Sequence, residues 1–153
     1  YGPRGRPDMA PFKFVDRVMR GLPIQQFGDG TSSRDYTYID DIVEGVIRTS
    51  DQIAEADPNY DANEPDASRS NAPWRVFNIG CERPVELLRY IEVIEECTGR
   101  EAIKNMLPMQ PGDVKATYAD VSALVDAVGY RPQVSLEEGM QRFVDWYRDY
   151  YKL

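Results

Sequence analysis

An arginine that precedes an alternating aromatic segment is the residue of this sequence best placed to do chemistry. Arg34 belongs to residues 33–41, whose sequence is SRDYTYIDD. The alternation of aromatic and polar residues predicts a half-buried strand over Asp35–Ile39. A strand would hold the arginine in place, and its guanidinium presents a planar fork of donors to a phosphate or a carboxylate. An equally weighted alternative is a surface ion pair with Asp35 or Asp40, which would contribute little stability.

Other routes to chemistry are limited by the residue types present. The chain contains no histidine, which removes Ser-His and Cys-His nucleophilic pairs. Cys81 and Cys97 are too few for a disulfide framework and do not cluster as zinc ligands, so both are expected to be free thiols in a reducing compartment. The Gly28-Asp29-Gly30 turn favours a simple chain reversal over a phosphate cradle, because neither a G-x-G-x-x-G nor a Walker A pattern is present.

The chain is acidic, and its charge is unevenly distributed. Its 153 residues include 26 Asp and Glu against 18 Lys and Arg, a formal net charge of −8. This balance disfavours nucleic acid as a partner, and no apolar run reaches the roughly 18 residues that a membrane span needs. Six acidic residues and three prolines lie between positions 51 and 73. A mobile acidic surface loop is therefore expected at 55–73, either serving solubility or covering a ligand as a lid.

Apolar periodicity and turn residues predict a mixed α/β chain with five helices. Helices are expected over 11–20, after Asp40 or Asp41 as the capping residue, over 86–98, over 121–128 and from 136 onward. Ser135 and Glu138 have the spacing of a capping box for the last helix. The expected core face of this helix is Leu136, Met140, Phe143, Val144 and Tyr147. Strands are expected over 24–27, 35–39, 75–79 and 102–107. The second helix carries an apolar stripe formed by Ile42, Val43, Val46 and Ile47.

Several short motifs occur in an order that is typical of one superfamily. They are YGP at 1–3, FGDG at 27–30, RDYTYIDD at 34–41, FNIG at 77–80 and PGD at 111–113. This ordered set resembles the C-terminal part of the extended short-chain dehydrogenases/reductases, the NAD-dependent epimerase/dehydratase family. The segments RGRPDMA at 4–10 and LPMQPGDV at 107–114 are similar to those of UDP-glucuronate 4-epimerases, whereas galactose 4-epimerases commonly have arginine in place of Gln110. The resemblance covers essentially the whole chain.

The resemblance implies that a Rossmann half precedes this part of the protein. In the family, that half binds NAD and carries a Ser/Thr and a Tyr-x-x-x-Lys pair, and no tyrosine here is followed four residues later by lysine. Residues 1–153 are therefore expected to form one nucleotide-sugar-binding domain, a small sheet with about five helices and no Rossmann half. This part would have no catalytic residue and bind no cofactor, and the parent would use NAD and form a homodimer through the missing half.

The resemblance assigns three polar residues to the ligand's phosphates and ribose. Arg34 would hold the pyrophosphate of a UDP-sugar, and Asn78 would donate its amide to the same phosphates. Asp113 would accept hydrogen bonds from the ribose hydroxyls. As alternatives, Asn78 and Asp113 are residues that commonly form turns.

Five further residues would complete the ligand site. Gln26 and Phe27 would border the uracil, through backbone groups and an aromatic face, although Phe27 also suits an ordinary core position. Met9 and Ala10 would line the nucleotide cleft at the start of the first helix, where N–H groups favour an anion. Arg6 would face the sugar.

The function implied is to anchor UDP while a 4-keto sugar rotates between two hydride transfers, interconverting UDP-glucuronate and UDP-galacturonate. The alternatives are part of another nucleotide-sugar epimerase, dehydratase or decarboxylase, and a non-catalytic UDP-binding or interaction module. A cytoplasmic protein that supplies polysaccharide precursors is expected.

Overall fold

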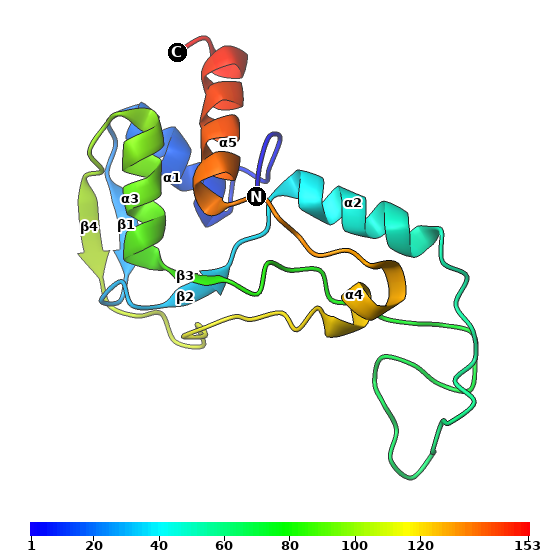
Figure 1. Cartoon of the computed structure of the whole chain (residues 1–153). Helices are drawn as coiled ribbons and strands as arrows, with labels where there is room; N and C mark the ends of the chain where they lie inside the picture. Colours follow the sequence, from blue (N-terminus) through cyan, green and yellow to red (C-terminus); the bar gives the residue numbers. More distant parts are fainter.

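Five helices and four short strands form a mixed α/β structure, as the sequence predicts (Figure 1). The computed structural model describes all residues, 1–153. In chain order the elements are α1 (Ala10–Met19), β1 (Ile24–Phe27), β2 (Ser33–Asp35), α2 (Ile39–Ser50), β3 (Pro84–Glu86), α3 (Leu87–Thr98), β4 (Lys104–Leu107), α4 (Ser122–Val128) and α5 (Leu136–Tyr151).

The strands form two separate pairs. β1 and β4 are parallel, with Ile24 opposite Lys104, and β2 and β3 are antiparallel, with Arg34 opposite Val85. A parallel pair cannot be closed by a hairpin, so the chain between β1 and β4 passes through β2, α2, β3 and α3 before it returns. This crossover brings segments far apart in the sequence to one side of the molecule.

The core lies where α1, α3 and α5 pack together (Figure 1). The predicted core face of α5 is confirmed for four of its five residues, because Met140, Phe143, Val144 and Tyr147 are buried at helical spacing, whereas Leu136 is partly buried. Fully burying one apolar side chain of this size stabilises a fold by about 1.5–3 kcal/mol, so this face suffices to fix α5 on the other two helices.

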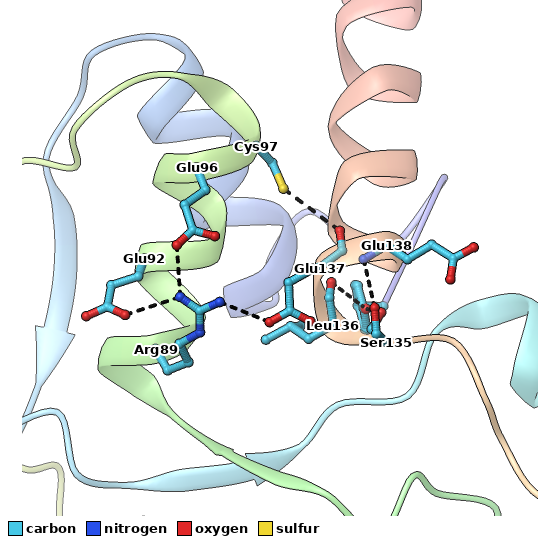
Figure 2. Close-up of polar contacts among 9 residues, drawn as sticks. Arg89, Glu92, Glu96, Cys97, Ser135, Leu136, Glu137 and Glu138 are labelled. Carbon is cyan, nitrogen blue, oxygen red and sulfur yellow. Dashed lines mark hydrogen bonds and ion pairs between the residues drawn. The ribbon is translucent and has the colours of Figure 1, made fainter.

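Polar contacts tie α3 to the start of α5 (Figure 2). Arg89 of α3 donates to Glu96 at 2.9 Å within its own helix and to Glu137 of α5 at 3.0 Å. One of the two hydrogen bonds of the predicted capping box of α5 is present, since the Ser135 hydroxyl accepts from the Glu138 N–H at 3.1 Å. The Glu138 carboxylate does not complete the capping box, because it pairs with Arg142.

Two predicted strands are wrong. The strand expected over 35–39 ends at Asp35, because its partner there is Pro84, which lacks the N–H needed to continue the ladder. The residues that follow are taken up by an aromatic cluster and by the start of α2. The strand expected over 75–79 is extended chain with one isolated bridge, Arg69–Arg75, because no neighbouring strand lies beside it.

The expected cap of α2 is also wrong. Tyr38 occupies the N-cap position, and no side chain caps the helix. Asp41 is buried and turns to a distant segment, accepting from the Tyr130 hydroxyl at 2.8 Å and from the Gln133 and Val134 N–H groups at 3.2 and 2.9 Å. The predicted apolar stripe of α2 is largely uncovered, with Val43, Val46 and Ile47 each about half exposed.

The acidic segment forms a long excursion after α2 that projects from the end of the molecule farthest from β1 and β4 (Figure 1). Within it, Arg69 pairs with Asp57 at 3.2 Å and with Asp66 at 2.9 Å. Elsewhere Cys81 is buried and Cys97 is partly exposed, both as free thiols. None of the helices combines the length and apolar character required to span a bilayer.

Candidate functional site

A cleft of about 360 Å³ lies between the start of α1, β1 and β2. Five of the eight residues predicted for a ligand site line it. They are Met9, Ala10, Phe27, Arg34 and Asp113. These residues come from four separate stretches of the chain, so the fold rather than sequence proximity brings them together.

Arg34 is held in a fixed orientation at this cleft. Its Nη2 donates to Asp113 Oδ1 at 2.7 Å, and its Nη1 donates to the carbonyl of Ser33 at 2.8 Å and that of Lys115 at 3.4 Å. The side chain is 26% exposed, so one edge of the guanidinium is occupied while the group still reaches solvent. Arg34 therefore forms its ion pair with Asp113, 79 positions away in the sequence, rather than with Asp35 or Asp40.

A tight turn presents Asp113. The Asp113 N–H donates to the Gln110 carbonyl at 3.2 Å, which places Pro111 and Gly112 at the two central positions. Proline suits the first of these, and the φ of +81° at Gly112 favours glycine at the second, so the sequence specifies this turn locally. The Asp113 carboxylate, 39% exposed, can accept further hydrogen bonds from a ligand.

Strand alternation decides which side chains of β1 reach the cleft. Gln25 and Phe27 line it, whereas Ile24 and Gln26 lie on the opposite, buried face. Gln26 is 2% exposed, so its side chain does not reach the cleft, and its predicted contact with a base would involve backbone groups alone. The side chain of Gln25 does line the cleft. It was not among the predicted site residues, although the alternation along the strand is visible in the sequence.

The beginning of α1 closes one side of the cleft. Met9 is the N-cap residue, and no side chain satisfies the first-turn N–H groups of this helix. Such groups favour a bound anion, as the sequence predicts for Met9 and Ala10.

Two other predicted residues lie outside the cleft. Arg6 lines an adjoining cavity of about 290 Å³, which shares Met9 and Pro11 with the cleft, and it pairs with Asp8 at 2.5 Å. The Asn78 amide donates to the Asp120 carbonyl at 3.2 Å, near the start of α4, and so does not join Arg34. Its position follows from the unpaired segment 75–79, which runs toward α4 rather than beside β2.

Tyr36 is a cleft residue that sequence reasoning did not assign. It follows Arg34 by two residues and lines the same cavity. Burial raises the pKa of Tyr36 to about 12, so its phenol keeps its proton at neutral pH. The signal that was available is the two-residue spacing, which puts both side chains on one side of an extended chain.

The family model described as GDP-mannose 4,6 dehydratase matches residues 1–143. The chain belongs to this family, within the extended short-chain dehydrogenases/reductases. This assignment covers more than nine-tenths of the sequence and agrees with the mixed α/β architecture of related solved structures, among them a dTDP-glucose 4,6-dehydratase from Bacillus anthracis that is 18% identical, with a TM-score of 0.78.

More specific similarity is to UDP-glucuronate 4-epimerases. A probable UDP-glucuronate 4-epimerase of Rhizobium meliloti is 49% identical over 154 residues, covering 99% of this chain and 45% of the relative. The crystal structure of a Bacillus cereus UDP-glucuronic acid 4-epimerase in complex with UDP-glucuronic acid and NAD is 34% identical, with a TM-score of 0.81, covering 99% of this chain and 43% of that chain. The chain thus spans less than half the length of these members of the epimerase/dehydratase family.

Proposed function

We propose that this chain is the UDP-sugar-binding portion of a UDP-glucuronate 4-epimerase and that the cleft at Arg34 anchors the UDP group. The observation that carries the proposal is the convergence of Arg34, Asp113 and Phe27, from separate segments, on one cavity of about 360 Å³. A cation, a hydroxyl acceptor and an aromatic ring match the diphosphate, the ribose and the uracil of one ligand. Similarity to relatives named as UDP-glucuronate 4-epimerases supports this choice of nucleotide sugar.

Arg34 supplies the attraction for the diphosphate. Two unit charges about 4 Å apart interact by roughly 4 kcal/mol at an effective dielectric near 20, before desolvation is counted. The backbone carbonyls of Ser33 and Lys115 hold the guanidinium in advance, so little side-chain entropy is lost when the ligand binds. An acidic protein can therefore bind an anion at this position.

Asp113 would keep its contact with Arg34 and accept hydrogen bonds from the ribose hydroxyls with its remaining lone pairs. Phe27 would offer one face to the uracil. Arg6, in the adjoining cavity, would face the sugar, and Gln26 would meet the uracil through its backbone groups, because its side chain is buried. Asn78 does not line the cleft, and its amide donates to the Asp120 carbonyl, so it is not assigned to the phosphates.

The oxidation and reduction at C4 of the sugar belong to the whole protein, with NAD as the hydride carrier. We expect no NAD site of this chain's own, since neither β1 nor β4 is followed by a glycine-rich turn into a helix of the kind that holds a dinucleotide pyrophosphate. This chain's own contribution is to hold the nucleotide in place while the sugar turns over in the active site. A homodimeric, cytoplasmic enzyme that supplies polysaccharide precursors remains the wider proposal.

A second candidate is another nucleotide-sugar epimerase or dehydratase, which the description of the matching family model favours. Titration with UDP-glucuronate, UDP-galactose and dTDP-glucose separates the candidates. Tightest binding of UDP-glucuronate supports the first, and tightest binding of dTDP-glucose supports a dehydratase.

Calorimetric titration of UDP into the wild-type chain and an Arg34→Ala variant tests the anchor. One hydrogen bond to a charged group contributes about 1.5–3 kcal/mol, so Arg34→Ala should weaken UDP binding at least about tenfold. Arg142→Ala is the matched control, since it removes an exposed arginine of α5 that is also paired with a carboxylate. Unchanged affinity in Arg34→Ala, or an equal loss in Arg142→Ala, would remove the cleft from the proposal.

A further inference from the structure

The hydroxyl of Tyr36 is an unused hydrogen-bonding group at the cleft. Tyr36 and Arg34 lie on the same side of an extended stretch, and both line the cavity. The Arg34 guanidinium is held by three contacts within the chain, whereas the Tyr36 hydroxyl makes no hydrogen bond to any other residue. The hydroxyl of Tyr36 is not sealed from solvent, unlike that of Tyr90, and the residue lines the cavity, so a group from outside the chain can reach it.

The ring of Tyr36 is rigidly supported. It stacks on Tyr90 with a centroid separation of 4.1 Å and an interplanar angle of 18°, and Tyr90 is 0% exposed on α3. The edge of Tyr1 meets it at 6.4 Å. Two aromatic neighbours therefore fix the direction of the phenol before any ligand arrives, which keeps the entropic cost of using it low.

The position of Tyr36 relative to Arg34 indicates which part of a ligand it meets. Asp113 and Phe27 contribute the nucleoside end of the proposed site. Tyr36 contacts Tyr1, and Tyr1 lines the adjoining cavity together with Arg6. Two residues of extended chain advance about 6.6 Å, so a phenol at this position reaches beyond the group held by Arg34.

We propose that Tyr36 is a further binding residue, whose phenol O–H donates to an anionic oxygen of the distal phosphate of a bound nucleoside diphosphate. This inference rests on the proposed function, because it takes UDP to lie in the cleft with its base toward Phe27. A phenol is protonated at neutral pH, and burial, which raises the pKa of Tyr36 further, keeps it a hydrogen-bond donor.

Calorimetric titration of a Tyr36→Phe variant with UDP and with UMP tests this role. The substitution keeps the ring stacked on Tyr90 and removes only a hydroxyl without a partner, so the midpoint of thermal unfolding should not fall. UDP should bind about tenfold more weakly, the usual loss for one hydrogen bond to a charged acceptor, and UMP should bind within twofold of the wild type. Tyr150→Phe, which removes an exposed phenol on α5, should bind both nucleotides as the wild type does.

The outcomes separate this inference from the proposed function. If Arg34→Ala loses UDP affinity while Tyr36→Phe retains it, the role of Tyr36 is wrong and the anchor stands. If Tyr36→Phe weakens UDP and UMP equally, the contact is not to the distal phosphate, and the inference is overturned. If the wild-type chain binds no UDP, both are overturned.

Discussion

Replacing Asp41 should destabilise the fold far more than replacing its neighbour Asp40. Asp41 is 6% exposed and joins α2 to a segment about 90 residues later. Its Oδ1 accepts from the Tyr130 hydroxyl, and its Oδ2 accepts from two backbone N–H groups, those of Gln133 and Val134. Asp41→Ala removes the carboxylate that accepts from all three donors.

The expected loss follows from these contacts. A hydrogen bond to a charged group contributes about 1.5–3 kcal/mol, and a buried donor left unpaired costs about 1–3 kcal/mol. The Tyr130 hydroxyl keeps the Asp41 backbone carbonyl at 3.1 Å, and water can reach part of the 133–134 segment. We therefore expect Asp41→Ala to lower the free energy of unfolding by about 3 kcal/mol, a large share of the 5–15 kcal/mol typical of a domain.

Urea unfolding followed by tryptophan fluorescence measures this difference. Asp41→Asn should recover only part of the loss, because an amide offers one acceptor oxygen where the structure uses two. Asp40→Ala is the internal control, since the Asp40 side chain is 68% exposed and contacts Arg142 only at 3.5 Å. Equal stability of Asp41→Ala and Asp40→Ala would refute the view that Asp41 fastens α2 to the chain that precedes α5.

Three further predictions concern other parts of the fold. Tyr90→Phe removes a buried hydroxyl that has no partner, so the free energy of unfolding should stay level or rise by up to about 1 kcal/mol; a loss above 1 kcal/mol would reveal a partner. The pKa of Glu137 is lowered by its own backbone N–H at the start of α5 and by Arg89, so its contribution to stability is present at neutral pH and is lost as pH falls below the ordinary carboxyl range. Glu137→Gln should flatten the acid side of a stability–pH curve between about pH 5 and 3, and an unchanged curve would contradict this. The uncovered face of α2 should cause concentration-dependent self-association in sedimentation, which Val46→Lys should reduce; a monomer at every concentration would argue against it.

Elements whose signals are local were predicted well. The strand over 24–27 has the predicted bounds, and three of the five helices end at or just before a glycine in the left-handed region, with φ of +68° at Gly21, +66° at Gly99 and +63° at Gly129. Periodicity also identified the buried face of α5, because that face packs against α1 and α3 within the same chain.

Errors arose where a distant partner decides the outcome. The pattern over 75–79 suits a strand, but a strand exists only where a second one pairs with it. Asp41 has the chemistry of a helix cap, yet donors about 90 positions away take its carboxylate. Neither the missing strand partner nor the distant donors can be recognised from the residues adjacent in the sequence.

The cleft depends both on residues that local sequence signals identify and on a contact between distant segments. Arg34 and Asp113 were each singled out for a ligand contact, but not as partners for one another. Their pairing depends on the chain after Asp113, which runs along β2: the Ser33 N–H donates to the Lys115 carbonyl at 2.9 Å, and the Thr117 N–H donates to the Ser33 carbonyl at 3.2 Å. These backbone hydrogen bonds place the turn at residues 110–113 beside Arg34.

The same arrangement constrains how an anion can bind here. In the structure, the charge of Arg34 is largely balanced by Asp113, so a diphosphate gains little long-range attraction from a chain of net charge −8. Binding must then depend on short contacts: unused guanidinium N–H groups, the uncapped start of α1, and ribose hydroxyls that donate to the remaining lone pairs of Asp113. A free phosphate offers no pair of ribose hydroxyls to Asp113, whereas a nucleotide does. The ion pair therefore favours a phosphorylated ribose over a simple anion, and the selectivity of the cleft lies in Asp113 as much as in Arg34.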